Sequence, residues 1–379
     1  MTSETDAKPR APRDYTTGSL RKNIWLLAVP MVLEMGLVSL FRVADMFWVG
    51  KLGPEALAAI TIGENVRWAL SGLAMGQGIG GLAVVARRIG ERDERAANHA
   101  TLQAVLLALI FASLIGVVGF VFAEPILLLM GTRPDVMPQA LIFLQVTFAG
   151  LTGFLMVPII SSLLRGAGEA RLSLIVRVVC YASGLLVEPL LIFGWGPIPA
   201  LGVVGAALAL VGSQWLGFLL QLGILVSGRA RIRIDLRHLR VDLPLMWHIF
   251  RIALPSTLQM TLRSFSRATL LGVVALYGTF AVAAYGIASR VFMTAFVPGF
   301  GLGNAASTLV GQNLGAGKPD RAERSAWITA SYNLAFMLVC AIAVVFNAES
   351  IVAAFNDAPD VVALGAQALR IFSIGYVFS

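Results

Sequence analysis

Four carboxylic acids interrupt the long apolar segments in the first half of the chain: Glu34, Asp45, Glu64 and Glu188. A charged side chain at the centre of a bilayer costs about 2.5–3.5 kcal/mol, so an acid in such a position usually belongs to the path of an ion or a substrate. Burial disfavours the charged form, which lets a carboxyl group bind and release protons near neutral pH. These residues therefore predict a proton or cation site inside a membrane.

Glu34 and Asp45 are eleven residues apart, which is three turns of helix. We therefore expect both side chains on one stripe of the first helix, facing the same cavity. Pro30 lies in the same segment and removes a backbone hydrogen bond, which permits a kink that responds to the protonation state of the acids. Pro255 holds the matching place in the second half, and both prolines are candidate hinges.

Two of these acids also have a purely structural interpretation, and both alternatives stay open. Arg42 stands three residues before Asp45, where an ion pair would keep the carboxylate ionised. Glu64 stands near the start of the second apolar segment, where the positive end of a helix dipole favours an acid at the membrane interface.

Other motifs give no support for an enzyme or a metal site. The run Gly76-Gln-Gly78-Ile-Gly80-Gly81 fits G-x-G-x-x-G, but it lies inside an apolar segment instead of following a strand. Small residues at this spacing let membrane helices approach closely, and we expect that role here. Cys180 and Cys340 fall inside predicted spans in different halves, so no disulfide or zinc site is expected. The metalloprotease, Walker and nucleophile-elbow patterns are absent from the sequence.

The composition predicts the elements that must position these acids. Hydrophobic residues make up 58% of the 379 residues and charged residues 13%, with a mean hydropathy of +0.81. A bilayer core of about 30 Å requires around 20 helical residues. Apolar runs of that length lie near 24–50, 58–86, 98–122, 138–164, 172–194, 202–226, 248–276, 280–310 and 325–347, and a tenth begins near Val361. The prediction is an all-α, polytopic membrane helix bundle.

The chain also contains an internal repeat. The segment from Ile24 to Gly90 aligns without gaps to the segment from Ile249 to Gly315, so that Pro30 meets Pro255 and Gly90 meets Gly315. Duplicated apolar bundles are typical of membrane transporters whose two halves rock about a site between them.

The repeat and the polar segments divide the chain into a tail (1–20), an N-lobe of six helices (21–228), a basic linker (229–244) and a C-lobe (245–379). Because six spans precede the linker, both lobes have the same orientation, as parallel six-helix repeats. We expect the second repeat to be truncated within its fourth helix, so that helices eleven and twelve are missing from this sequence.

Basic residues fall on alternate loops, at 8–22, 87–95, 165–171, 229–240 and 318–324, whereas the opposite loops hold only Lys51 and Arg133. The positive-inside rule then places the N-terminus in the cytoplasm of a prokaryotic plasma or inner membrane. This distribution explains the net charge of +8 without nucleic-acid binding. The polar N-terminus does not resemble a cleavable signal peptide.

Several spaced motifs resemble the multidrug and toxic compound extrusion (MATE) family, and specifically its DNA-damage-inducible protein F branch. They are the run from Val43 to Ala59 (VADMFWVGKLGPEALAA), RGAGEAR at 165–171, EPLLIFG at 188–194 and QNLGAGKPDRA at 312–322. The resemblance extends over nearly the whole chain from Arg21 onward.

The resemblance implies a proton- or sodium-coupled antiporter that exports organic, amphipathic and often cationic compounds by alternating access. It assigns coupling to Asp45 on the first helix, with Pro30 as the kinking proline, and an acid on the fifth helix at Glu188. In the family an asparagine often stands four residues before that acid, whereas Gly184 occupies the place here, which favours protons over sodium. We expect a monomer that needs no cofactor besides the coupling ion.

Two alternatives follow from related proteins. A flippase of lipid-linked oligosaccharides shares the duplicated bundle but needs a cationic cavity for pyrophosphate, and Arg263, Arg267 and Arg290 are the residues that would form it. The other alternative is a non-transporting receptor or assembly partner.

Overall fold

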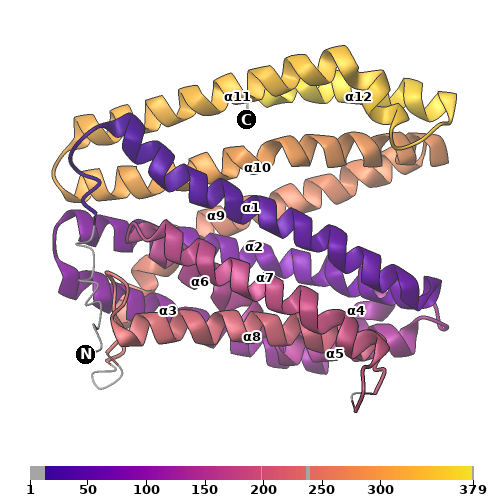
Figure 1. The fold of residues 1–379 in the computed structure, drawn as a ribbon, viewed down its shortest axis with the longest axis horizontal. Helices are drawn as coiled ribbons and strands as arrows, with labels where there is room; N and C mark the ends of the chain where they lie inside the picture. The colour runs from indigo at the N-terminus through magenta and orange to yellow at the C-terminus, as the bar shows by residue number, and fades with distance from the viewer. Residues whose placement is uncertain (1–12, 198, 236–239, 378–379) are drawn as a thin grey trace, which may run out of the picture.

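The computed structural model describes residues 13–197, 199–235 and 240–377, and within them every regular element is helical. Each apolar run predicted from the sequence contains a helix (Figure 1). The helices are α1 (Leu20–Val49), α2 (Pro54–Gly90), α3 (Glu94–Val121), α4 (Ala123–Leu129), α5 (Met137–Ala149), α6 (Leu151–Gly166), α7 (Ala170–Phe193), α8 (Val203–Ser227), α9 (Leu243–Ala275), α10 (Thr279–Gly315), α11 (Pro319–Ala353) and α12 (Pro359–Val377), with a short 3₁₀ turn at Gly50–Leu52.

Seven of these helices are long and apolar enough to cross a bilayer, and α5 together with α6 makes an eighth span. The span predicted over 138–164 is present but bent, because α5 and α6 meet at Gly150 at an angle of 50°. A side chain at Gly150 would overlap Val211 of α8, so the bend lies where two helices press together. The all-α, membrane-spanning prediction is confirmed.

The two halves of the chain contact each other through the first two helices of each repeat. In the N-lobe, α2 packs on α3, α5 and α6, and α7 packs on α8, while α10, α11 and α12 pack on one another (Figure 1). Between the halves, α1 lies along α10, α9 lies along α2, and α2 crosses α10. The first helix of each repeat thus packs mainly on the second helix of the other repeat.

The contacts between the halves follow the internal repeat. Gly76 of α2 packs on Thr257 of α9, and Gly301 of α10 packs on Val32 of α1. The two glycines occupy equivalent repeat positions, and so do Val32 and Thr257. Gly76 and Gly301 therefore serve close helix packing, the role that the sequence favoured over phosphate binding.

A second pair of glycines at equivalent repeat positions, Gly90 and Gly315, closes one end of the bundle. A Cβ at Gly90 would overlap the Gln312 carbonyl group, and a Cβ at Gly315 would overlap the Arg87 carbonyl group. The α2 and α10 backbones thus touch at this crossing, which only glycine permits. Beside this crossing, two hydrogen bonds join α10 to the end of α6: Gln312 Nε2 donates to the Gly166 carbonyl oxygen at 2.8 Å, and the Thr308 hydroxyl donates to the Arg165 carbonyl oxygen at 3.2 Å.

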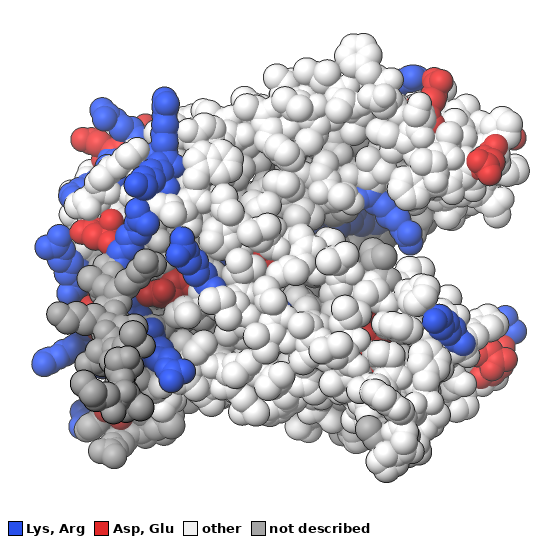
Figure 2. All heavy atoms as spheres, in the orientation of Figure 1, with Lys and Arg blue, Asp and Glu red and all other residues white. Residues whose placement is uncertain are grey.

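We call this closed end the basic end, because Lys and Arg side chains gather there around the ends of α2, α3, α10 and α11 (Figure 2). At the opposite end, the open end, Figure 2 shows the bundle hollowed between the C-lobe helices and the N-lobe. The linker at 229–244 runs over the basic end in its described part, and its residues 236–239 lie outside the described chain.

We predict that Gly90→Ala and Gly315→Ala each push α2 and α10 apart at the basic end. The added methyl group meets backbone, which cannot rotate away as a side chain can. Distances between spin labels at the exposed positions 88 and 323 measure the separation. Gly286→Ala on α10 is the matched control, because its Cβ would enter open space. An unchanged distance in both test variants would contradict the closure described here.

Candidate functional site

A cavity of about 770 Å³ lies between the two halves and is lined by α1, α2, α6, α7 and α8 from the N-lobe and by α9, α10 and α11 from the C-lobe. Five of the residues proposed from the sequence line it: Glu34, Asp45, Glu64, Arg263 and Arg267. Glu188 is buried behind the lining, and Arg290 is exposed and lies outside it. The predicted shared cavity for Glu34 and Asp45 is therefore present.

Glu34 forms a buried ion-pair cluster with two arginines. Its Oε1 lies 3.1 Å from Arg165 NH1 and 3.2 Å from Arg177 Nε, and its Oε2 accepts a hydrogen bond of 2.9 Å from the Ser173 hydroxyl. The Glu34 side chain is 1% exposed. The cluster joins α1 to α6 and α7, so this acid holds three helices together at the floor of the cavity.

Arg165 differs from the sequence-based expectation. Its position in a loop motif suggested a cytoplasmic charge, but it lies in the last turn of α6 with 5% of its surface exposed. Arg177, which the sequence reasoning did not single out, joins it. A buried Glu34 requires a cationic partner, and that requirement is the signal by which both arginines could have been found.

Asp45 and Glu188 face each other from α1 and α7. The Asp45 carboxyl group is within hydrogen-bonding reach of Glu188, whose side chain is 2% exposed. Neither Glu188 oxygen accepts a hydrogen bond from an N–H or O–H donor in the described chain. Ionised carboxylates are acceptors only, so two of them hydrogen-bond to each other only when one carries a proton. This geometry suits a pair that takes up and releases a single proton.

The two structural alternatives have different outcomes. The Arg42 side chain lies outside the described residues, so the proposed pair with Asp45 is not placed. Glu64 lies well inside α2, pairs with Arg67 and lines the cavity, so it is not an acid of the helix start. Arg67 also lies over the Phe154 ring, 4.8 Å from its centroid.

The two candidate hinge prolines lie within continuous helices. Pro30 is buried in α1 and Pro255 is exposed in α9, and neither helix has a break at its proline. The structure therefore shows the unbroken form of both helices. Within the described residues no group of three or more His, Cys, Asp and Glu side chains is arranged to hold a metal ion.

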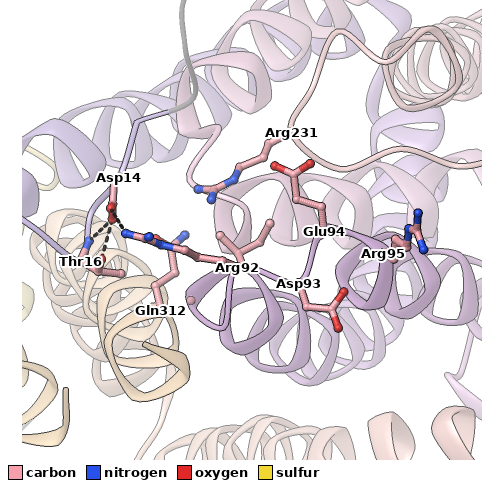
Figure 3. A pocket seen from close by; sticks show the side chains of 10 residues that line it. Asp14, Thr16, Arg92, Asp93, Glu94, Arg95, Arg231 and Gln312 are labelled. Carbon is pink, nitrogen blue, oxygen red and sulfur yellow. Dashed lines mark hydrogen bonds and ion pairs between the residues drawn. The ribbon is translucent and has the colours of Figure 1, made fainter. Parts of the chain in front are cut away.

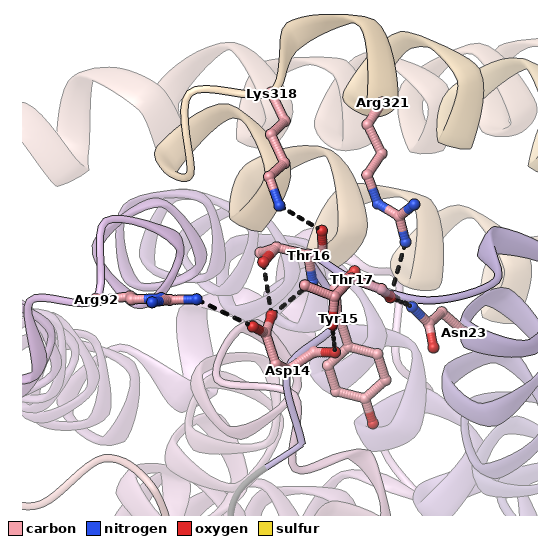
Figure 4. Close-up of polar contacts among 8 residues, drawn as sticks. All are labelled: Asp14, Tyr15, Thr16, Thr17, Asn23, Arg92, Lys318 and Arg321. Atoms are coloured by element: carbon pink, nitrogen blue, oxygen red, sulfur yellow. Dashed lines mark hydrogen bonds and ion pairs between the residues drawn. The ribbon is translucent and has the colours of Figure 1, made fainter.

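The segment 13–19 runs across the basic end and joins the two halves (Figure 4); we call it the strap. Lys318 Nζ donates to the Thr16 carbonyl oxygen at 2.9 Å, and Arg321 donates to the carbonyl oxygens of Thr17 and Gly18 at 2.9 and 2.8 Å. On the N-lobe side Arg92 lies 3.5 Å from Asp14. The strap therefore ties the start of α11 to the end of α2.

Asp14 organises the strap. Its Oδ1 accepts hydrogen bonds from the Thr16 hydroxyl at 2.6 Å and the Thr16 amide at 2.8 Å. These bonds lower the pKa of Asp14 from its ordinary value, against a smaller opposing effect of burial. A lowered pKa means that the contribution of this carboxylate is present at neutral pH and is lost only as the pH falls through that lowered value.

A second cavity, of about 540 Å³, lies beside the strap (Figure 3). Its charged lining is balanced, with three acids and three arginines: Asp14, Asp93, Glu94, Arg92, Arg95 and Arg231. Since neither sign of charge dominates and Asp93 already caps α3 through the Ala96 amide, we assign the cavity no ligand.

Comparisons with known proteins agree with this architecture. The family model described as MatE matches residues 30–190 and 255–379. An FAD transporter of Shewanella oneidensis is 28% identical over 341 residues, which cover 88% of this chain and 74% of that protein. The probable multidrug resistance protein YoeA of Bacillus subtilis is 26% identical over 322 residues, covering 84% and 70%.

Among solved structures, a MOP superfamily transporter from Pyrococcus furiosus matches with a TM-score of 0.88 and 26% identity, covering 96% of this chain and 81% of that one. That transporter is described as having a binding pocket of reverse polarity.

We predict that Glu34→Gln lowers the free energy of unfolding by about 3–5 kcal/mol, because it leaves two buried guanidinium groups without their counter-ion. Unfolding of the purified protein by a denaturing detergent measures the change. Glu349→Gln removes the carboxylate of an exposed pair with Arg370 and is expected to stay within about 1 kcal/mol of wild type. Equal effects of the two substitutions would show that the Glu34 cluster is not structural.

We also predict that Arg321→Ala loosens the strap and favours separation of the basic end by about 1 kcal/mol, because two hydrogen bonds from a charged donor are lost. The readout is the rate at which single cysteines at the basic end react with a water-soluble thiol reagent. Arg324→Ala is the control, since Arg324 is exposed on the same helix and binds no described residue. Equal reaction rates in wild type and Arg321→Ala would show that the strap does not hold the basic end closed.

Proposed function

Since this chain belongs to the MatE family of membrane transporters, we propose that it is a proton-coupled antiporter that exports organic, amphipathic compounds by alternating access. The observation that carries the proposal is the cavity between the lobes, which lies above a sealed basic end and holds acids on its wall. A transporter must not open at both ends together, and the crossing of α2 and α10 meets that requirement.

The proposed orientation places the basic end in the cytoplasm of a prokaryotic inner membrane, by the positive-inside rule. The cavity then faces outward, in the state that releases cargo and receives protons. Proton entry from outside would favour release, and the lobes would then rock to open the basic end.

Asp45 and Glu188 are the proposed coupling pair. Their contact favours a shared proton, and Gly184 supplies no amide oxygen for a sodium ion at the place where the family resemblance implies asparagine. Pro30 and Pro255 are the proposed hinges, through which α1 and α9 would bend when the charge of the pair changes. Glu34 is assigned a structural role, because its carboxylate is occupied by two arginines.

The driving force depends on the charge of the cargo. Exchange of one proton for one monovalent cation moves no net charge, so each pH unit supplies about 1.4 kcal/mol, or tenfold accumulation. When one exchange moves a net positive charge inward, as with a neutral cargo, the membrane potential adds about 2.3 kcal/mol per elementary charge and 100 mV.

The relatives differ in cargo. The similar proteins include an FAD transporter and probable multidrug resistance proteins, and FAD contains a pyrophosphate group. The sequence suggested an often cationic cargo, but Arg263 and Arg267 on the cavity wall weigh against it. The same two residues favour, as a second candidate, a flippase for a lipid pyrophosphate; Arg290 does not contribute to that wall.

We predict that Asp45→Asn abolishes pH-driven efflux from proteoliposomes while the protein remains folded in the membrane. The asparagine amide can donate to Glu188 as a protonated Asp45 would, so the pair is held permanently in its protonated form. Efflux of a fluorescent substrate after an imposed pH gradient is the measurement.

Asp135→Asn is the control, because Asp135 forms an exposed pair with Arg133 between α4 and α5. Retained pH-driven efflux in Asp45→Asn would show that another residue carries the coupling ion.

A further inference from the structure

The charged residues on the cavity wall do not balance. Five arginines line it against three carboxyl groups: Arg67, Arg165, Arg177, Arg263 and Arg267 against Glu34, Asp45 and Glu64. A cleft lined by an excess of one sign of charge attracts ligands of the opposite sign, so this excess favours anionic ligands.

On the N-lobe wall the acids are already engaged. Glu64 pairs with Arg67 one to one. Glu34 is shared between Arg165 and Arg177, which leaves one guanidinium charge of this cluster uncompensated. The Arg165 Nε atom makes no hydrogen bond in the described chain, and the Arg177 Nε atom lies 3.2 Å from the carboxylate that both arginines share. Asp45 faces another acid, Glu188.

The C-lobe wall carries the rest of the excess. Arg263 and Arg267 are one turn apart on α9, so they project from the same face of the helix. No described residue forms a hydrogen bond or an ion pair with either guanidinium group. Neither α9 nor α10 contains an aspartate or a glutamate. This wall therefore provides two cations and no counter-ion.

An apolar surface continues the same wall. Phe292, Phe296 and Phe300 line the cavity from α10, together with Met260 and Met293. The Phe292 and Phe296 ring centroids are 4.7 Å apart. Aromatic and methionine side chains accept flat, apolar bodies of varied shape.

We propose that this wall is a binding site for organic anions: compounds in which a phosphate, sulfonate or carboxylate group is attached to a flat apolar body. Arg263 and Arg267 hold the anion, since guanidinium groups bind such oxygens in pairs of parallel hydrogen bonds. The body lies on the α10 phenylalanines. This inference rests on the proposed export function, for which it names the substrate class.

The site separates the cargo from the coupling proton. The anion binds on α9 of the C-lobe, whereas Asp45 and Glu188 lie on α1 and α7 of the N-lobe. The two ligands thus do not compete for one charge, and their exchange is transmitted through the α1–α10 and α2–α9 contacts between the lobes.

Two dyes with the same xanthene ring system and opposite charge test the site: fluorescein, an anion at neutral pH, and rhodamine 123, a cation. Fluorescence anisotropy with the purified full chain gives the affinity for each. We expect tighter binding of fluorescein by about tenfold or more, weakening as salt is added. Equal affinities, or tighter binding of rhodamine 123, would overturn the proposal.

The variant Arg263→Gln with Arg267→Gln is expected to lose about tenfold in fluorescein affinity for each arginine and to leave rhodamine 123 binding unchanged or stronger. Arg290→Gln is the matched control, because Arg290 is exposed on the same lobe and does not line the cavity. Unaltered fluorescein binding in the double variant would exclude these arginines as the site.

A transport assay separates this inference from the proposed export function. Efflux of fluorescein and of rhodamine 123 from proteoliposomes is compared with the flipping of a fluorescent phosphatidylglycerol in the same kind of vesicle. If fluorescein binds at the arginines and leaves the vesicles with a pH gradient, both proposals stand. If only the anionic lipid crosses, the anion site stands and the antiport of soluble compounds is wrong. Efflux of rhodamine 123 alone would support export and overturn the anion site.

Discussion

The rest of the structure depends on the direct contact of the α2 and α10 backbones at Gly90 and Gly315. Each glycine lies against the carbonyl group of a residue at an equivalent position in the other repeat, so the contact has the pseudo-twofold symmetry of the duplication. Together with the strap it closes the basic end, opposite the end at which the bundle is hollowed. Because such close packing requires the absence of side chains, the contact depends on glycine at both positions.

Buried charge is the second constraint. In a low-dielectric interior an acid needs a partner, and the three acids on the cavity wall have different ones. Glu34 is held between two arginines and connects α1 to α6 and α7. Glu64 is held by Arg67. Asp45 faces Glu188, a second acid, and we propose that this pair binds the coupling proton. No described residue pairs with Arg263 or Arg267 on α9, and this difference between the lobes separates the proposed proton site from the proposed anion site.

The sequence predicted the helices, the membrane-spanning class and the family, because apolar runs, repeat glycines and motifs are local patterns. It also predicted that Glu34 and Asp45 share a cavity, since helical periodicity fixes their common face. The partners of those acids were not predictable in the same way. Arg165 looked like a loop charge because its contact with Glu34 joins residues 131 positions apart. The bend at Gly150 and the strap across the basic end likewise depend on tertiary packing, which local patterns do not encode.

We propose that the two ends of the bundle open alternately about the α2–α10 contact under the control of Asp45. The most direct test measures two spin-label distances in one protein as the pH is lowered, one across the open end at positions 51 and 277 and one across the basic end. We expect the two distances to change in opposite directions and Asp45→Asn to remove the response to pH. Distances that stay constant, or that lengthen and shorten together, would contradict it.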